Sequence, residues 1–209
     1  MESEPSGLAL SIIGLLIGAS VAINVSSLFP TAQVELFPLE GGYVDHVDDL
    51  GGATNLGITE KLARQYGYEG DMRDLPMETA LVIAYREFWE PLQLDAIATL
   101  EDTLYMNLAL QLYKFGFHAG RGRSVELFQR CLNVLNQDQR LYPDIRVDRG
   151  MGRRTLAAFE AYRAGFGESG VEPIVTCVDG LTVAYYVHIS ERRPQNESFT
   201  RGWLNRLGD

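Results

Sequence analysis

The most informative part of the sequence is residues 40–59, Glu40-Gly41-Gly42-Tyr43-Val44-Asp45-His46-Val47-Asp48-Asp49-Leu50-Gly51-Gly52-Ala53-Thr54-Asn55-Leu56-Gly57-Ile58-Thr59. Glycine and aspartate are so frequent here that the stretch suits turns and a short irregular hairpin, and argues against a long helix. From Thr59 the pattern becomes helical, because threonine is a good helix cap and apolar residues then recur at helical spacing. The chain therefore enters its helical part through a small β element.

The carboxylates of this stretch suit the hydrolysis of a glycosidic bond. Glu40 follows the apolar residues 36–39, and a carboxyl group with apolar neighbours has a raised pKa and can donate a proton. Asp49 lies in a polar segment and stays ionised, so it can position water or stabilise positive charge on the sugar. Asp45 and Asp48 are alternatives for that second role.

Other residues of the stretch can contact the sugar or the water. Gly41 and Gly42 let the backbone come close to a bulky glycan. Tyr43 can line the sugar cleft, although an aromatic side chain here can also serve packing alone. Thr54 can orient the attacking water, unless it is a strand residue that bonds its own backbone. The competing interpretation makes the aspartates loop residues or calcium ligands, but their spacing does not match an EF-hand.

The rest of the chain is predicted to be mainly helical. After the helix that Thr59 caps, further helices are expected from the entry at 74–78 to Trp89, and over 104–116, 124–135, 155–162 and 181–189. The fold class is therefore α+β, mainly α, with one small β-hairpin.

Residues 7–28 carry no charge and are long enough to cross a bilayer as a helix. Only eleven of these 22 residues are Leu, Ile or Val, and the others are Gly, Ala, Ser and Asn, which weaken insertion. A cleaved signal peptide, a permanent anchor and a weak anchor that later releases the protein all remain open. We favour the last, a signal-arrest-release segment that inserts as a helix.

The charge of the chain bears on its partners. The formal net charge of −10 disfavours a general affinity for nucleic acid. Residues 1–120 hold 5 basic and 17 acidic side chains, whereas residues 121–209 hold 13 and 11, which indicates two parts with different surfaces.

The cysteines and histidines predict no metal site. Three histidines form no metal-binding triad on their spacing, and two cysteines are too few for a zinc cluster or a disulfide scaffold. Cys131 lies on the apolar face of its helix and Cys177 in an apolar run, so two buried free thiols are expected. A single disulfide remains possible if the protein is exported.

Residues 40–59 resemble a stretch of the glycoside hydrolase family 108 muramidases, many of which are endolysins of bacteriophages. Glu-Gly-Gly-Tyr is followed by Asp at +9, Gly-Gly at +11 and +12, Thr at +14 and Gly-Ile-Thr at +17 to +19. Further segments that resemble the family are 85–89, 117–120, 147–155 and 199–206, so that the similarity covers residues 34–206. Two positions depart from the pattern: Arg149 stands where the family usually has Gly, and His118 where it has Asn, so no role is carried onto them.

The resemblance implies a lysozyme-like fold with an N-terminal segment over 1–29, a catalytic domain over 30–120 and a helical peptidoglycan-binding-like part over 121–209. It implies hydrolysis of the β-1,4 bond between N-acetylmuramic acid and N-acetylglucosamine in bacterial peptidoglycan, which would lyse the host cell. Glu40 would be the general acid, with Asp49 and Thr54 on the water side and with no metal or other cofactor.

The same resemblance implies where the protein acts. It would be tethered to the inner membrane through residues 7–28 and then work in the periplasm as a monomer. Two alternatives from other classes stay open, a lytic transglycosylase that uses Glu40 alone and a non-catalytic peptidoglycan-binding module.

Overall fold

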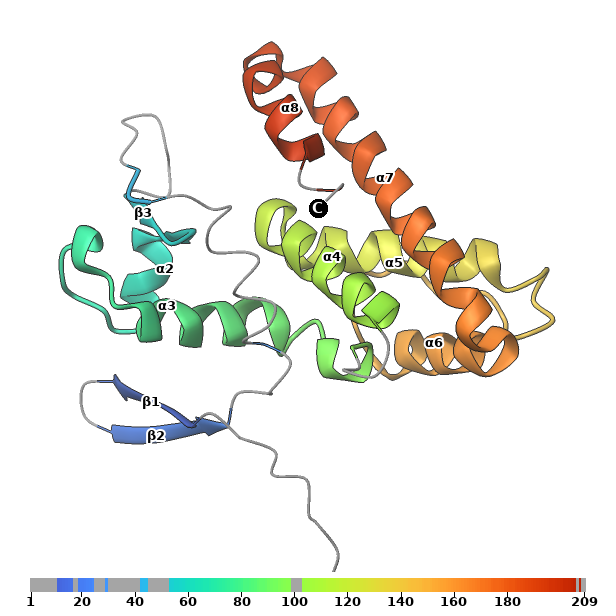
Figure 1. Ribbon diagram of the computed structural model, residues 1–209, viewed down its shortest axis with the longest axis horizontal. Coiled ribbons are helices and arrows are strands. Elements are labelled where there is room, and N and C mark those ends of the chain that lie inside the picture. Colours follow the sequence, from blue (N-terminus) through green and yellow to red (C-terminus); the bar gives the residue numbers. More distant parts are fainter. Residues whose placement is uncertain are drawn as a thin grey trace, which may run out of the picture. The chain divides into compact units, whose positions relative to one another are not determined.

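The computed structural model (Figure 1) describes residues 11–16, 19–24, 29, 42–44, 53–98, 103–205 and 207. The chain divides into two compact units, Met1–Glu90 and Pro91–Asp209. The first unit holds small strands and short helices, and the second is helical. The first unit includes the described part of the Gly-rich stretch.

The N-terminal segment forms strands where we expected a helix. Strands β1 (Ser11–Leu16) and β2 (Ala19–Asn24) pair in antiparallel fashion, with Ser11 opposite Asn24. The prediction of a membrane-inserting helix over 7–28 is therefore wrong for these twelve residues. The physical reason is composition, because β-branched Ile and Val favour strands while Gly and Ser disfavour the interior of a helix. Within the described part of the chain, no helix has the length and apolar character needed to span a membrane.

The predicted small hairpin is confirmed at β3 (Thr54–Asn55) and β4 (Ile58–Thr59). Its two-residue turn has positive φ at both positions, 51° at Leu56 and 71° at Gly57. That conformation is a type I′ turn, whose twist matches that of paired strands. Glycine adopts it freely, whereas leucine rarely does.

Short helices follow the hairpin. The Thr59 hydroxyl caps α2 (Glu60–Gln65) by accepting a hydrogen bond from the Leu62 N–H, as the sequence predicts. A 3-10 helix (Met72–Asp74) leads to α3 (Met77–Ala84), which continues as a π-helical turn (Tyr85–Trp89). Phe29 and Trp89 are fully buried, with their rings in edge contact. These two rings form part of the core of the first unit.

The second unit consists of packed helices. They are α4 (Thr103–Ala119), α5 (Arg121–Leu135), α6 (Arg153–Phe166), α7 (Val171–Arg192) and α8 (Glu197–Asn205), joined in places by 3-10 turns. The predicted helices over 104–116, 124–135, 155–162 and 181–189 are confirmed, but α7 begins ten residues earlier than expected. Helix α7 packs along α4 and α5 and meets α8 near its C-terminal end (Figure 1).

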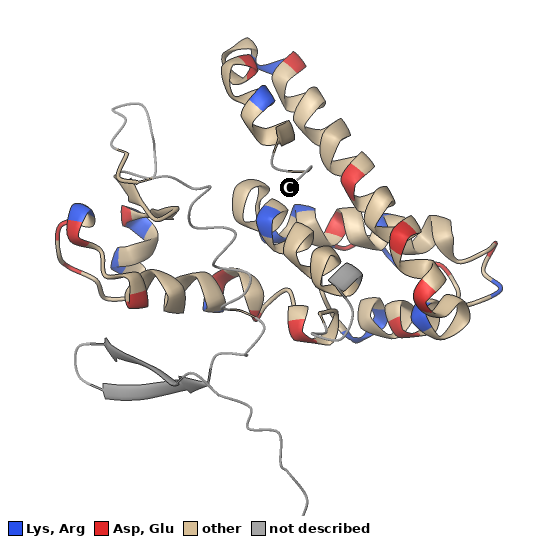
Figure 2. Ribbon diagram, in the orientation of Figure 1, with Lys and Arg blue, Asp and Glu red and all other residues tan. Residues whose placement is uncertain are grey.

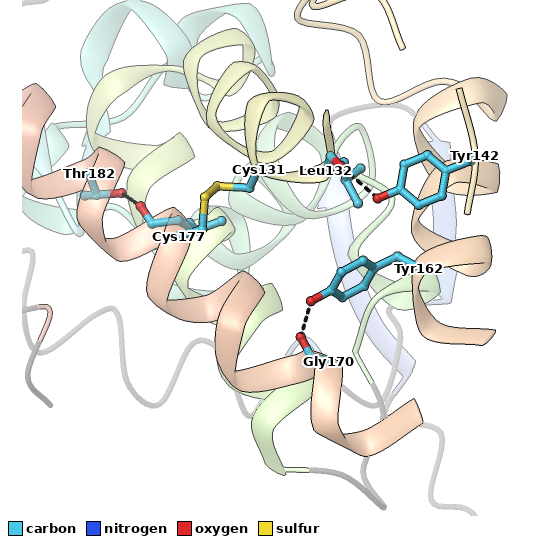
Figure 3. The surroundings of a disulfide bond; sticks show 8 residues. Cys131, Leu132, Tyr142, Tyr162, Gly170, Cys177 and Thr182 are labelled. Atoms are coloured by element: carbon cyan, nitrogen blue, oxygen red, sulfur yellow. Dashed lines mark hydrogen bonds between the residues drawn. A yellow bond between two sulfur atoms is a disulfide. The ribbon is translucent and has the colours of Figure 1, made fainter. Parts of the chain in front are cut away.

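A disulfide ties α5 to α7 (Figure 3). Cys131 and Cys177 are bonded with their Cα atoms 5.8 Å apart, so the expectation of two free thiols is wrong. Each cysteine lies in an apolar segment, as predicted, but the packing of α7 against α5 brings the two together. A contact between residues 46 positions apart cannot be read from either segment alone.

Candidate active site

The described part of the Gly-rich stretch is bound to the hairpin by its backbone. Val44 and Thr54 form an antiparallel bridge in which each N–H donates to the other's carbonyl oxygen at 2.8 Å. Thr54 also pairs with Thr59 across the hairpin, so that Val44, Thr54 and Thr59 lie side by side in one row. This row fixes the two ends of segment 45–53.

The two faces of the hairpin differ in exposure. Ala53, Asn55 and Ile58 form the buried face, at 9, 8 and 0% exposed. Alternation along a strand turns Thr54 to the opposite face, where its side chain is half-buried. Within the described residues the Thr54 hydroxyl has no hydrogen-bond partner. Thr54 thus lies on the accessible face, although its backbone also belongs to a strand.

Asn55 anchors the hairpin to the next element, and sequence analysis missed this residue. Its buried side-chain N–H₂ group donates to the carbonyl oxygens of Met72 at 2.7 Å and Arg73 at 3.3 Å. A buried amide must be hydrogen-bonded, because an unpaired one is costly. The signal available was an asparagine among strand residues, on the same face as Ile58.

Tyr43 lies beside Arg73. The guanidinium carbon of Arg73 is 4.6 Å from the centre of the Tyr43 ring, a cation–π geometry. Asp71 accepts hydrogen bonds from the backbone N–H and the guanidinium of Arg73, which keep the pKa of Asp71 below its usual value. Tyr43 is half-buried in this arrangement, and a role in lining a sugar cleft stays a prediction.

The other predicted site residues, Glu40, Gly41 and Asp49, lie outside the described residues, whereas Gly42 is described and exposed. Glu40 is four positions before Val44, so their Cα atoms are at most about 14 Å apart along an extended chain. Within the described ranges, no group of three or more His, Cys, Asp or Glu side chains is arranged to hold a metal ion.

In the second unit, the turn before α6 is built around Gln129. The buried Gln129 side chain donates to Asp148 Oδ1, Gly150 O and Thr155 Oγ1 and accepts from the N–H groups of Asp148 and Arg149. These bonds lower the pKa of Asp148, chiefly through the Gln129 amide. Arg149 has a φ of 66°, which suits glycine, and its guanidinium bonds Glu126 at 2.8 Å. The backbone thus keeps the conformation of the expected Gly despite the Arg.

Two models of known protein families match the chain, one over the hairpin region and one over the helices that follow. The model of the family described as Glycosyl hydrolase 108 matches residues 34–112, which include the hairpin and Tyr43. This part of the chain is therefore similar to the glycosyl hydrolase 108 family. A second family model, Predicted Peptidoglycan domain, matches residues 123–208 and so includes the Gln129-centred turn.

A solved structure has a similar fold. The structure of Brucella abortus SagA is similar, with a TM-score of 0.63 and 23% sequence identity over 86% of this chain and 89% of that chain. No curated protein matches the sequence. The match to a glycosidase family and the match to a peptidoglycan domain support a glycosidase that degrades peptidoglycan.

Proposed function

We propose that this glycosidase hydrolyses the β-1,4 bond between N-acetylmuramic acid and N-acetylglucosamine in peptidoglycan. The observation that carries the proposal is the bridge between Val44 and Thr54 within residues 34–112, the part that matches the glycosidase family. The bridge holds Thr54 on an accessible face, and it joins the two ends of the segment that contains Asp49. Glu40, four residues before Val44, is the general acid.

The reaction needs one proton donor and one water-binding pair. Glu40 gives its proton to the glycosidic oxygen as the bond from that oxygen to the anomeric carbon breaks. Asp49 and the Thr54 hydroxyl orient a water that adds to the anomeric carbon, and Asp49 takes the proton that the water loses. A carboxyl separation of about 6.5–9.5 Å would give inversion, and about 5–5.5 Å retention.

Tyr43, Gly41 and Gly42 are the proposed sugar-binding residues. The glycines let the glycan approach the backbone, and the Tyr43 ring, beside Arg73, offers a flat apolar surface to a sugar.

We propose that the protein acts outside the cytoplasmic membrane, as the lytic enzyme of a bacteriophage. The disulfide between Cys131 and Cys177 supports this location, because disulfides persist in oxidising compartments such as the periplasm. Residues 7–28 are the proposed membrane-associated segment. Cell fractionation during expression tests the location, and recovery of a reduced protein from the cytoplasm alone would contradict it.

Digestion of purified peptidoglycan by the full chain tests the chemistry. The unsubstituted protein should release fragments with hydrated muramic-acid ends. Glu40→Gln should lower the rate of hydrolysis by a factor of about 10²–10⁴, because the proton donor is lost. Glu78→Gln removes an exposed carboxylate of α3 and should leave the rate unchanged. Anhydro ends would instead show a lytic transglycosylase, and no product from any variant would leave a binding module.

Thr54 allows a finer comparison. Thr54→Val keeps the shape of the side chain but removes the hydroxyl, and should lower the rate roughly tenfold through lost positioning of water. Thr54→Ser keeps the hydroxyl and should retain most of the activity. Equal rates for the Val and Ser variants would remove Thr54 from the mechanism.

A further inference from the structure

The second unit contains an arginine-lined groove far along the chain from Glu40. Two adjoining hollows of about 450 and 380 Å³ share Arg123, Tyr185 and His188 among their lining residues. Arg192 and Arg193 line the first hollow and Arg130 the second. We call this surface, Arg123, Arg130, Tyr185, His188, Arg192 and Arg193, the arginine groove.

The arginine groove carries an excess of positive charge. Among the described residues that line the two hollows, Glu126 is the one carboxylate, and it is already paired with Arg149 at 2.8 Å. Arg130, Arg192 and Arg193 are exposed, and among the residues that the structure describes none forms an ion pair with them. Figure 2 shows basic residues on α5 and near the end of α7. The groove therefore has arginines without a described ion-pair partner at both hollows, Arg192 and Arg193 at the first and Arg130 at the second.

Arg123 is fixed in place before any ligand binds. Its Nη1 donates to the Ala119 carbonyl oxygen at 2.8 Å, and its guanidinium carbon lies 5.6 Å from the centre of the Tyr185 ring. A guanidinium has five N–H donors in a planar fork, so these contacts leave donors for a ligand. Because the side chain is already ordered, less conformational entropy is lost when it binds.

We infer that the arginine groove binds the free carboxylates of the stem peptides of peptidoglycan. The inference rests on the proposed function, which gives peptidoglycan as the substrate. Guanidinium groups bind carboxylates through paired N–H···O bonds, whereas the uncharged parts of a glycan would gain little from four cations. Apolar atoms of Ile189 and Leu181 also line the hollows and suit the methyl groups of alanine. The second unit would thus hold the peptides while the first unit cleaves the glycan.

Binding of the full chain to purified sacculi, freed of other wall polymers, tests the inference. The Glu40→Gln protein serves as the parent, so that the sacculi stay intact. Adding Arg192→Gln and Arg193→Gln should lower the affinity at least tenfold, since each lost charged hydrogen bond weakens binding by about that factor. The matched control is Arg154→Gln, which removes an exposed arginine of α6 outside the groove and should not change the affinity.

A second ligand separates carboxylate recognition from glycan binding. Glycan strands stripped of stem peptides should bind the parent and the Arg192→Gln, Arg193→Gln variant equally. The affinity for intact sacculi should also fall as salt is added, because screening weakens attraction between exposed charges.

Equal binding of intact sacculi by the parent and the arginine variant would overturn the inference, as would a loss of binding to stem-free glycan of the same size. Product release by the unsubstituted chain is measured in parallel. A failure there would refute the proposed hydrolase and would leave the binding comparison intact.

Discussion

The hairpin region, over the described residues from 42 to 89, and the helical unit, over 103–205, are held together in different ways. The hairpin region has strands of two residues, joined by the Val44–Thr54 bridge and by the Asn55 side chain. The helical unit has helices of 9 to 22 residues that share a core and a disulfide. Individual hydrogen bonds thus shape the part of the candidate active site that is described, whereas shared packing stabilises the helical unit.

The largest expected effect is on the stability of the helical unit. Replacing Cys131 and Cys177 by serine should lower the free energy of unfolding of the helical unit by roughly 4 kcal/mol, because the disulfide closes a loop of 46 residues. Hydrogen exchange measured peptide by peptide should show faster exchange in α5 and α7 but not in α2 and α3. Equal acceleration in both regions would show that the two regions unfold as one.

The second largest expected effect is on the stability of the hairpin region. Asn55→Ala leaves the Met72 carbonyl without its buried donor and should cost roughly 1–3 kcal/mol, with faster exchange confined to peptides of residues 53–89. The matched control is Asn133→Ala, which removes a similar pair of bonds to the backbone of Ile145 in the helical unit. The two variants should give opposite exchange patterns, and the same pattern from both would contradict the comparison.

One pH effect should arise in the helical unit, at Asp179. The Gln111 side chain donates to Asp179 Oδ2 at 3.0 Å, and within the described structure Gln111 Oε1 and Asp179 Oδ1 are buried without a partner. Burial raises the pKa of Asp179 to about 6. A proton on Asp179 removes the negative charge that burial disfavours.

The direction of this pH effect follows from the pKa of Asp179 in the folded and in the unfolded protein. The folded protein keeps the Asp179 proton up to about pH 6, whereas the unfolded chain loses it near pH 4. The free energy of unfolding should therefore fall by roughly 2 kcal/mol as the pH rises from 4 to 6. Asp179→Asn keeps an uncharged donor and should remove this fall. Denaturant titrations across that range measure it, and an identical pH dependence for both proteins would contradict the assignment.

The smallest expected effect concerns the backbone at Arg149 in the helical unit. Arg149→Ala should lower the free energy of unfolding by up to about 1 kcal/mol, because it loses the bond to Glu126. Its backbone keeps the φ of 66°, which is as unfavourable for alanine as for arginine. Arg149→Gly loses the same bond but suits that backbone, and should be more stable than the Ala variant by roughly 0.5 kcal/mol. Thermal unfolding of the two variants checks this order, and a reversed order would show that the turn is not strained.

Local signals predicted the elements that depend on local chemistry. Thr59 predicted its own capping bond, and Pro91 marked the end of the helix that closes with Trp89. The start of α7 was missed because Pro173 and Gly180 suggest a break. Proline is tolerated in the first turn of a helix, however, where its missing N–H costs nothing. Packing along α4 and α5 then carries the helix through Gly180.

Features that depend on distant residues could not be predicted. The disulfide needs two helices to meet, and the role of Asn55 depends on the backbone of Met72. Length and apolar content indicated a helix over 7–28, but these two properties do not distinguish a helix from a strand pair. Of the candidate site, Tyr43 and Thr54 were predicted and are described, whereas the support from Asn55 and Arg73 was not predicted.

The bridge between Val44 and Thr54 also makes the chain tolerant of variation. The nine residues between them are closed at the base by two backbone hydrogen bonds that do not depend on side-chain identity. Doubling the length of such a segment costs only about 0.6 kcal/mol in closure entropy. A change in the length of this segment should therefore leave the hairpin, α2 and the Asn55 anchor as they are, even where it moves Asp49.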